Sequence, residues 1–445
     1  MKIPHLKGFD EEAFQKYLKN TGWLMFGRIL SMVVSFVVAR RLGPDLFGDL
    51  NFAEALTAII AAVGALGLDS FIIREIINEP DKKDEILGTS FFMRVGVNLL
   101  LLPLSVVAYL ILHQLSANPG NSLTWVIFFF ALASFFKSFN VIDSYFQSQV
   151  QSKYVVQVQN ISLVLSNLFK VVVVLLLNAP LVWVALSVTF DAFVVATGLV
   201  IMYHRQGFKL RNFSFNKFRA FQLLRQSFPL ILSAVMVSIY MKIDMVMLKS
   251  LGSTAVGIYS AAAKISEAWY FIPVAIVTSV FPAIINARKT DMERYNKRLI
   301  NLYDLLVYIS VPLAIFISFF GTVITDLVYG AKFPGAGPML SIHIWSGVFV
   351  FLGSANGQYL LAEGYTSISF QRTAVGAVVN VLLNLWWIPL YGGIGTSLAT
   401  MVACFVSAFY VLLIPKTREQ GILMLKSLFL VHLFQKISAR AGSHN

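Results

Sequence analysis

The stretch LLLLPLSVVAYLIL, residues 99–112, contains no charged side chain. Similar apolar cores occur at residues 33–39, 59–68, 171–177, 194–202 and 402–414. Each core lies in a segment of about 20 mainly apolar residues, the length that an α-helix needs to cross the hydrocarbon of a bilayer. The whole chain is 57% hydrophobic and only 13% charged, which is too apolar for a soluble core. We therefore predict an all-α polytopic membrane protein.

Hydropathy predicts about twelve membrane spans in two sets of six. The first set covers residues 22–40, 46–68, 88–113, 123–148, 155–178 and 181–203. The second set covers residues 227–249, 255–286, 300–320, 339–361, 373–390 and 395–415. The connection between the sets, residues 204–226, carries six basic residues and no acidic one. We therefore expect an N-terminal lobe over residues 22–203, this basic cytoplasmic linker, and a C-terminal lobe over residues 227–415.

Basic residues are distributed unevenly between the two sides of the predicted membrane. With both termini inside, the inner connections and tails carry 25 of the 35 Lys and Arg residues, the outer connections four and the spans six. Short loops rich in Lys and Arg resist translocation and stay in the cytoplasm. We therefore predict that both termini are cytoplasmic. The net charge of +13 then reflects basic rims beside anionic lipid rather than a nucleic-acid partner.

The two ends of the chain are predicted to lie along the cytoplasmic membrane surface. Residues 1–21 show no cleavable signal pattern, because residues 10–12 are acidic and precede the first apolar run. They fit an interfacial helix. In the tail, residues 416–445, an apolar stretch at 422–434 is short for a span and fits a second surface helix.

The sequence does not predict metal, cofactor or catalytic chemistry. Cys404 is the single cysteine and lies in the last predicted span, and the six histidines show no ligand spacing. No phosphate-binding glycine loop followed by Lys and Ser or Thr is present. The connections are short and the inner ones basic, which disfavours a membrane-embedded glycosyltransferase or saccharide polymerase. We expect no enzyme, no resident metal and no cofactor.

An internal repeat relates the two halves of the chain. The segment LGPDLFGDLNFAEAL, residues 42–56, is similar to LGSTAVGIYSAAAKI, residues 251–265, at a constant offset of 209. Both copies follow the first span of their half and open the second, so the halves keep the same orientation in the membrane. Glycines can end a helix and turn the chain without steric cost. The repeat therefore predicts equivalent tight turns, with Gly43 matching Gly252 and Gly48 matching Gly257.

Several motifs resemble those of a known transporter family. In the first half they are Gly22-Trp23-Leu24, Arg40-Arg41-Leu42-Gly43-Pro44 with Phe47-Gly48, and Gly67-Leu68-Asp69-Ser70 with Arg74-Glu75. In the second half they are Asp244, Leu251-Gly252, Gly257-Ile258-Tyr259-Ser260-Ala261-Ala262, Asn380-Val381-Leu382-Leu383-Asn384, Ile388-Pro389-Leu390-Tyr391-Gly392, Gly395 and Ala399-Thr400. Over residues 20–415 the chain therefore resembles bacterial polysaccharide repeat-unit flippases, including the O-antigen flippases. These belong to the multidrug/oligosaccharidyl-lipid/polysaccharide exporter superfamily.

The resemblance implies two six-helix lobes facing each other across a central cavity. It also implies alternating-access transport of an undecaprenyl-diphosphate-linked oligosaccharide from the cytoplasmic to the periplasmic leaflet of the bacterial inner membrane, as in O-antigen and lipopolysaccharide biosynthesis. The expected partners are this lipid-linked glycan, membrane lipid, a coupling ion (H⁺ or Na⁺) and other polysaccharide assembly proteins. The alternative is a multidrug exporter of organic cations on the same fold, for which an acidic and aromatic lining would be expected.

Basic residues inside the predicted spans are the candidates for substrate binding: Arg28, Arg94, Lys137 and Lys170. An ionised side chain inside a span costs about 2.5–3.5 kcal/mol, so it normally faces a cavity or a partner. Arginine suits bidentate phosphate contacts and lysine acts as a point charge. Both types could bind an anionic pyrophosphate, and Lys137 and Lys170 disfavour a cationic cargo. The alternative is that these side chains pair with carboxylates or reach the membrane rim.

Acidic residues inside the spans are the candidates for ion coupling: Asp244, Glu267 and Asp191. A carboxylate in this setting could exchange an ion during each cycle, and a driving ion gains about 2.3 kcal/mol per charge per 100 mV. The alternative is a structural role, because Lys264 and Glu267 are three residues apart on one helical face and could pair. Asn380 and Asn384, four residues apart, are predicted to form hydrogen bonds between helices.

Overall fold

The computed structural model describes residues 11–115, 122–288 and 291–431, and the side chains of all of these except residues 11–26, 28, 115 and 282. The regular structure of these residues is helical throughout. Within them, nine helical segments are long and apolar enough to cross a membrane. The predicted all-α, multi-pass membrane protein is therefore confirmed.

The chain folds into two compact units, and each is described by itself. Unit 1 comprises Met1–Leu42 and Leu56–Val235, and unit 2 comprises Gly43–Ala55 and Met236–Asn445. The helices of unit 1 are α1 (Glu11–Ala61), α2 (Asp69–Asn78), α3 (Lys83–Leu115), α4 (Thr124–Phe136), α5 (Val141–Ser148), α6 (Lys153–Val171), α7 (Leu181–Arg205) and α8 (Lys217–Leu248). Parts of α1 and α8 belong to unit 2. Within this unit, α4 packs against α3 and α7, and α6 packs against α7. The domain boundaries predicted from the sequence stay a prediction.

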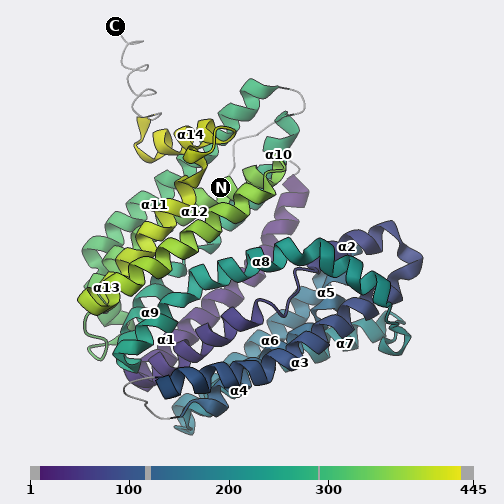
Figure 1. The fold of residues 1–445 in the computed structure, drawn as a ribbon, viewed down its shortest axis with the longest axis horizontal. Coiled ribbons are helices and arrows are strands. Elements are labelled where there is room, and N and C mark those ends of the chain that lie inside the picture. Colours follow the sequence, from purple (N-terminus) through teal and green to yellow (C-terminus); the bar gives the residue numbers. More distant parts are fainter. Residues whose placement is uncertain (1–10, 116–121, 289–290, 432–445) are drawn as a thin grey trace. The chain divides into compact units, whose positions relative to one another are not determined.

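Unit 2 is built from residues 43–55 of α1, the end of α8 and the helices that follow it. These are α9 (Ser253–Glu267), α10 (Phe271–Arg288), α11 (Met292–Tyr329), α12 (Ala336–Ala362), α13 (Thr366–Phe409) and α14 (Arg418–Leu428). Helices α11, α12 and α13 lie side by side, with α12 packed against both of the others (Figure 1). Their buried side chains form a continuous apolar core that includes Leu299, Tyr303, Leu306, Leu352 and Leu360.

Two long helices bend at glycines where the sequence predicts a break between spans. Helix α1 leaves helical geometry at Gly43, with φ 76° and ψ 172°, between the first two predicted spans. Helix α13 does so at Gly392, with φ 54° and ψ −133°, between the last two. Glycine favours these positions because a positive φ brings a Cβ into steric conflict with the backbone. The remaining predicted spans coincide with one helix or with two consecutive helices.

The predicted surface helices at the two ends lie partly outside the described residues. Helix α1 begins at Glu11 and continues into the first predicted span. Residues 11–21, which were predicted to belong to a separate surface helix, are therefore part of the same helix as that span. Residues 1–10 lie outside the description. Helix α14 covers the first part of the stretch at 422–434, and the residues after 431 are not described.

The two copies of the internal repeat pack against each other within unit 2. A Cβ built on Gly48 would collide with the backbone carbonyl of Ser253, and one built on Gly257 would collide with that of Pro44. These two contacts are equivalent, because the same offset of 209 relates Pro44 to Ser253 and Gly48 to Gly257. The second limb of α1 and helix α9 therefore cross at backbone contact, which only glycine permits at both positions.

The turns that precede the crossing are equivalent as well. Gly252 has φ 101° and ψ 167°, close to the backbone conformation of Gly43. Thr254 Oγ1 donates a hydrogen bond to Asp45 Oδ1 at 3.3 Å, and these two residues are also 209 positions apart. The predicted repeat is thus confirmed as a pseudo-symmetric pair of turns and helices.

Candidate functional site

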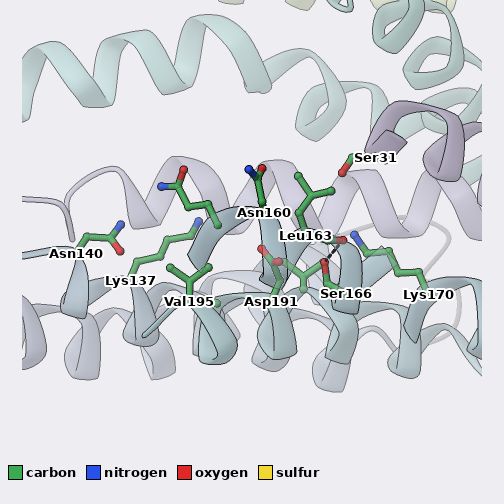
Figure 2. Close-up of a pocket in the computed structure, with 12 residues that line it drawn as sticks. Ser31, Lys137, Asn140, Asn160, Leu163, Ser166, Lys170, Asp191 and Val195 are labelled. Atoms are coloured by element: carbon green, nitrogen blue, oxygen red, sulfur yellow. Dashed lines mark hydrogen bonds between the residues drawn. The ribbon is translucent and has the colours of Figure 1, made fainter. Parts of the chain in front are cut away.

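Unit 1 contains a polar pocket of about 440 Å³ between α1, α6, α7 and the 3₁₀ segment η2 (Lys137–Asn140). Figure 2 shows Lys137 and Lys170 at the two ends of this pocket, with Asn160, Asp191 and Ser166 between them. The pocket thus brings together three of the site residues predicted from the sequence, namely both lysines and Asp191. Amide and hydroxyl side chains supply most of its other polar lining.

Both lysines lie where a helix changes its geometry. Lys137 opens η2, which joins α4 to α5 in place of a continuous α-helix. Lys170 lies two residues before η3 (Val172–Leu176), a π-helical turn at the end of α6. Such irregular turns are frequent at functional sites. They change the direction of successive side chains, which helps to place a charged group inside a bundle of apolar helices.

The positive charge of Lys137 in this pocket is not neutralised by any residue that the structure describes. This side chain is exposed and makes no hydrogen bond or ion pair with any residue that the structure describes. Lys170 is half-buried at the opposite end. Asn140, Gln159 and Asn160 line the same space and can both donate and accept hydrogen bonds. The pocket can therefore bind an anionic group together with neutral hydroxyl groups.

Asp191 is oriented by a neutral donor. The Ser162 hydroxyl donates to Asp191 Oδ1 at 2.7 Å and to the Asp191 backbone carbonyl at 2.9 Å. This contact joins α6 to α7 beside the pocket. Asp191 forms no ion pair with the described basic side chains.

Arg94 lies outside this pocket. Its Nη2 donates to Asp69 Oδ1 at 2.7 Å, and the Arg94 side chain is 3% exposed whereas that of Asp69 is 60% exposed. Ser144 Oγ donates to the same carboxylate oxygen at 3.3 Å. Of the environments that the sequence left open for Arg94, the structure shows pairing with a carboxylate. The side chain of the fourth candidate, Arg28, lies outside the described side chains.

In unit 2, Asp244 on α8 belongs to a buried cluster of hydrogen bonds. Tyr259 Oη and Thr400 Oγ1 donate to Asp244 Oδ2 at 2.7 and 2.5 Å, and Asn384 Nδ2 donates to Oδ1 at 2.6 Å. The donors come from α9 and from both limbs of α13. The Asn384 bond to Asp244 joins α13 to α8, which confirms for Asn384 the predicted hydrogen bonding between helices. Within α13, Asn384 also donates to Asn380 Oδ1 at 3.1 Å.

The Asp244 cluster is rich in oxygen atoms and lacks a basic partner among the described residues. Asp244 is only 3% exposed, and Asn384 Oδ1 has no hydrogen-bond partner in the described part of the chain. Carboxylate, amide and hydroxyl oxygens are the ligands that hard cations prefer. The same carboxylate could instead take up a proton. The arrangement can therefore bind H⁺ or a small monovalent cation inside the unit.

Glu267 lies outside this hydrogen-bonded cluster. Lys264 Nζ lies 3.8 Å from Glu54 Oε2, and no ion pair joins Lys264 to Glu267 among the described side chains, so the predicted local pair is wrong. Lys242 and Lys264 are the basic groups that act electrostatically on Glu267. Glu267 is thus a member of a mixed group of charges at the end of α9.

Curated relatives are similar to parts of this chain. An uncharacterised membrane protein of Methanocaldococcus jannaschii is 30% identical over 25% of this chain and 22% of its own length. The probable flippase AglR of Haloferax volcanii is 26% identical over 37% of this chain and 35% of its own length. The teichuronic acid biosynthesis protein TuaB of Bacillus subtilis is 29% identical over 36% of this chain and 32% of its own length. The chain spans less than half the length of the curated relatives it matches.

Solved structures share the fold over almost the whole chain. The lipid II flippase MurJ in an inward closed conformation has a TM-score of 0.74 at 17% identity, covering 94% of this chain and 93% of MurJ. An inward-facing multidrug resistance transporter of the MATE family has a TM-score of 0.68 at 16% identity, covering 90% of this chain and 96% of the transporter. At these identities the likeness shows the fold alone.

Family models agree with this fold. The model described as "Polysaccharide biosynthesis protein" matches residues 17–288, and the MatE model matches residues 229–386. Both the fold and the family are those of transporters, as predicted, and not those of an enzyme. Because the first match covers more than half of the chain, the protein belongs to the polysaccharide biosynthesis protein family of the superfamily that includes the MATE transporters.

Proposed function

We propose that the protein is a flippase for lipid-linked oligosaccharides in polysaccharide biosynthesis. The cargo is an undecaprenyl-diphosphate-linked repeat unit, moved from the cytoplasmic to the periplasmic leaflet of a bacterial inner membrane by alternating access. The observation that carries this proposal is the polar pocket in membrane-spanning helices with Lys137 and Lys170 at its two ends. The family match and the printed description of AglR as a probable flippase support it.

The pocket residues divide into two roles. Lys137 and Lys170 attract the pyrophosphate as point charges, because ammonium groups bind phosphate oxygens without a fixed geometry. Asn140, Gln159 and Asn160 bind sugar hydroxyl groups, since amides can donate and accept. Arg28 lies three residues before the pocket residue Ser31 on α1, and we retain it as a contributor to the same path. Arg94 supports the fold through Asp69.

Asp244 is the residue that we propose for ion coupling. Its carboxylate is fully inside the unit and its hydrogen-bond donors come from α9 and from both sides of the bend in α13 at Gly392. Uptake or release of H⁺ or Na⁺ there would change these bonds and so bias one arrangement of α13 over another. Asp191 and Glu267 are secondary candidates, because each lies beside basic groups rather than in an oxygen-rich cluster.

Glycan delivery to the periplasm of a flippase-deleted host tests the proposal. The double variant Lys137→Ala with Lys170→Ala should lower delivery about tenfold or more, since each lost charge-assisted contact is worth about 1.5–3 kcal/mol. Membrane insertion should be unchanged, because neither lysine contributes to the buried apolar core. The matched control is Lys332→Ala with Lys416→Ala, two exposed lysines outside the pocket.

Two outcomes would contradict the proposal. Wild-type delivery by the double variant would remove both lysines from the transport path. Failure of the wild-type chain to rescue any tested repeat unit, together with efflux of organic cations, would favour the multidrug exporter.

A further inference from the structure

A second cavity, of about 190 Å³, lies within unit 2 between α8, α12 and α13. Its polar lining includes Tyr240, Ser354, Arg372 and Ser407, and apolar side chains such as Phe349 form the rest of the wall. None of these residues belongs to the Asp244 cluster. The cavity is therefore separate from both sites described above.

Arg372 carries the charge of this cavity and has no counter-ion in the described part of the chain. Its side chain forms no ion pair or hydrogen bond there, and Nε is enclosed by protein without a partner. The ionisable groups that act on it electrostatically are the phenols of Tyr240 and Tyr303, and no carboxyl group is among them. An arginine within a membrane-spanning helix is costly unless a partner or water satisfies it. The N–H groups of Nη1 and Nη2, which are not enclosed in this way, therefore remain available to a ligand.

Two glycines of α12 make the space that the guanidinium occupies. A Cβ built on Gly353 would lie 3.4 Å from Arg372 Nη1, and one built on Gly357 would lie 3.0 Å from Nη2. These glycines are four residues apart, so they lie on one face of α12. Glycine inside a helix is less favourable than alanine by about 0.5–1 kcal/mol. The guanidinium thus packs against the glycine face of α12, and no ion pair with a described residue positions it.

The rest of the cavity suits a ligand that is part anionic and part apolar. The Ser407 hydroxyl makes no hydrogen bond with the described residues and can donate beside the guanidinium. The Tyr240 hydroxyl already donates to Cys404 Sγ at 2.7 Å, and the Ser354 hydroxyl donates to the Val350 carbonyl at 2.8 Å. The Ser407 hydroxyl and the Arg372 guanidinium are therefore the hydroxyl and charged groups of the lining that make no hydrogen bond with the described residues. Apolar side chains enclose the remainder.

We propose that Arg372 and this cavity form a second anion site, which binds an oxyanion group carried on an apolar chain. A guanidinium binds phosphate and carboxylate oxygens through paired N–H groups, so the shared chemistry is that of a phosphate or carboxylate headgroup. The site does not depend on the proposed transport of glycans. An anionic lipid and an acidic group on a transported amphiphile would both meet its requirements.

Thermal unfolding of the purified full chain in neutral detergent tests this site. The chain is titrated with dodecyl phosphate, dodecanoate, dodecyl glucoside and inorganic phosphate, and intrinsic fluorescence follows unfolding. We expect saturable stabilisation by at least one anionic amphiphile and none by dodecyl glucoside. Preference for dodecyl phosphate identifies a phosphate headgroup, and preference for dodecanoate identifies a carboxylate. Saturation by inorganic phosphate at the same concentration would identify free phosphate and overturn the requirement for an apolar chain.

Variants assign the binding to Arg372. Arg372→Gln should weaken the apparent affinity for the anionic amphiphile about tenfold or more, and Arg372→Lys by less, because lysine keeps the charge without the paired geometry. If Arg372→Gln does not fold, the weaker binding of Arg372→Lys carries the test. Arg418→Gln, which changes an exposed arginine outside the cavity, is the matched control and should bind as the wild type does.

Two results would overturn the site. One is unchanged affinity in both Arg372 variants. The other is loss of the stabilisation in the Lys137→Ala, Lys170→Ala variant, which would assign the binding to the pocket of unit 1. Because this measurement needs no transport, its failure is distinct from failure of the flippase proposal.

Discussion

Arg94 and Lys137 are basic residues in helices of the same unit, yet their surroundings differ completely. Arg94 is buried and paired with Asp69 at 2.7 Å. Lys137 is exposed to a pocket and has no partner among the described residues. A cation inside a predicted span can therefore be a structural element or a ligand-binding group, and the presence of a carboxylate from another helix decides which.

Unit 2 contains the same contrast with different chemistry. Asp244 accepts three hydrogen bonds from neutral donors, so contacts within the protein hold its carboxylate. Arg372 makes no hydrogen bond or ion pair with the described residues and lies beside a cavity. We expect the Arg94–Asp69 pair and the Asp244 cluster to contribute to stability, and Lys137 and Arg372 to contribute to binding with little effect on stability.

The largest effect is expected at the buried ion pair. Asp69→Asn should lower the free energy of unfolding by about 3 kcal/mol, because it leaves the buried Arg94 charge without its ion-pair partner. Arg94→Met should cost less, since the Asp69 carboxylate is 60% exposed and water can solvate it. Thermal or chemical unfolding of the purified variants measures both. Equal losses of unfolding free energy in the two variants would contradict this expectation, because the greater exposure of Asp69 predicts a smaller loss for Arg94→Met.

A smaller loss of stability is expected at Asp244. In Asp244→Asn, an amide group replaces one carboxylate oxygen and faces a hydroxyl or amide donor, so at least one buried donor loses its acceptor. Such a loss costs about 1–3 kcal/mol. Tyr259→Phe, which removes one donor from the same cluster, is the control for stability alone. Transport by Asp244→Asn should also stop responding to an H⁺ or Na⁺ gradient; a wild-type response would exclude Asp244 from coupling.

The smallest effect is expected at a partnered but solvent-exposed charge. Glu79 accepts hydrogen bonds from Lys82 Nζ and Arg219 Nη2, each at 2.8 Å. These bonds lower the pKa of Glu79 from its ordinary value of 4.5 to about 2. The folded state therefore gains stability above about pH 4.5, and this gain is lost as the pH falls toward 2. Glu79→Gln should show a flatter decline of the unfolding temperature between about pH 5 and about pH 2. An unchanged slope would contradict the shift.

Much of the fold could be predicted from local sequence. Span length and hydropathy depend on consecutive residues, so they indicate the helices directly. The bends at Gly43 and Gly392 fall between predicted spans because each interrupts an apolar run with a glycine that tolerates positive φ. The repeat was visible because its glycines are required by a backbone contact, which limits the choice of residue at both positions.

The partners of the charged groups could not be predicted in the same way. Asp69 and Arg94 belong to different helices, and neither hydropathy nor helical spacing relates them. Tyr259 and Thr400 are part of the family motifs, but nothing in their spacing indicates that both donate to Asp244. Hydropathy places Arg372 in the inner connection between the predicted spans 339–361 and 373–390, whereas α13 begins at Thr366 and includes it in a segment long and apolar enough to cross a membrane.

The crossing of the repeat copies has a consequence for how the protein can be divided. Residues 43–55 belong to unit 2 although their neighbours on both sides belong to unit 1, so the polypeptide passes between the units after Leu42, Ala55 and Val235. Cleavage within the basic linker would yield an N-terminal fragment that retains residues 43–55 of unit 2 and a C-terminal fragment that retains residues 227–235 of unit 1. The two fragments would then complement each other by exchanging these segments, as swapped elements do in an intertwined dimer.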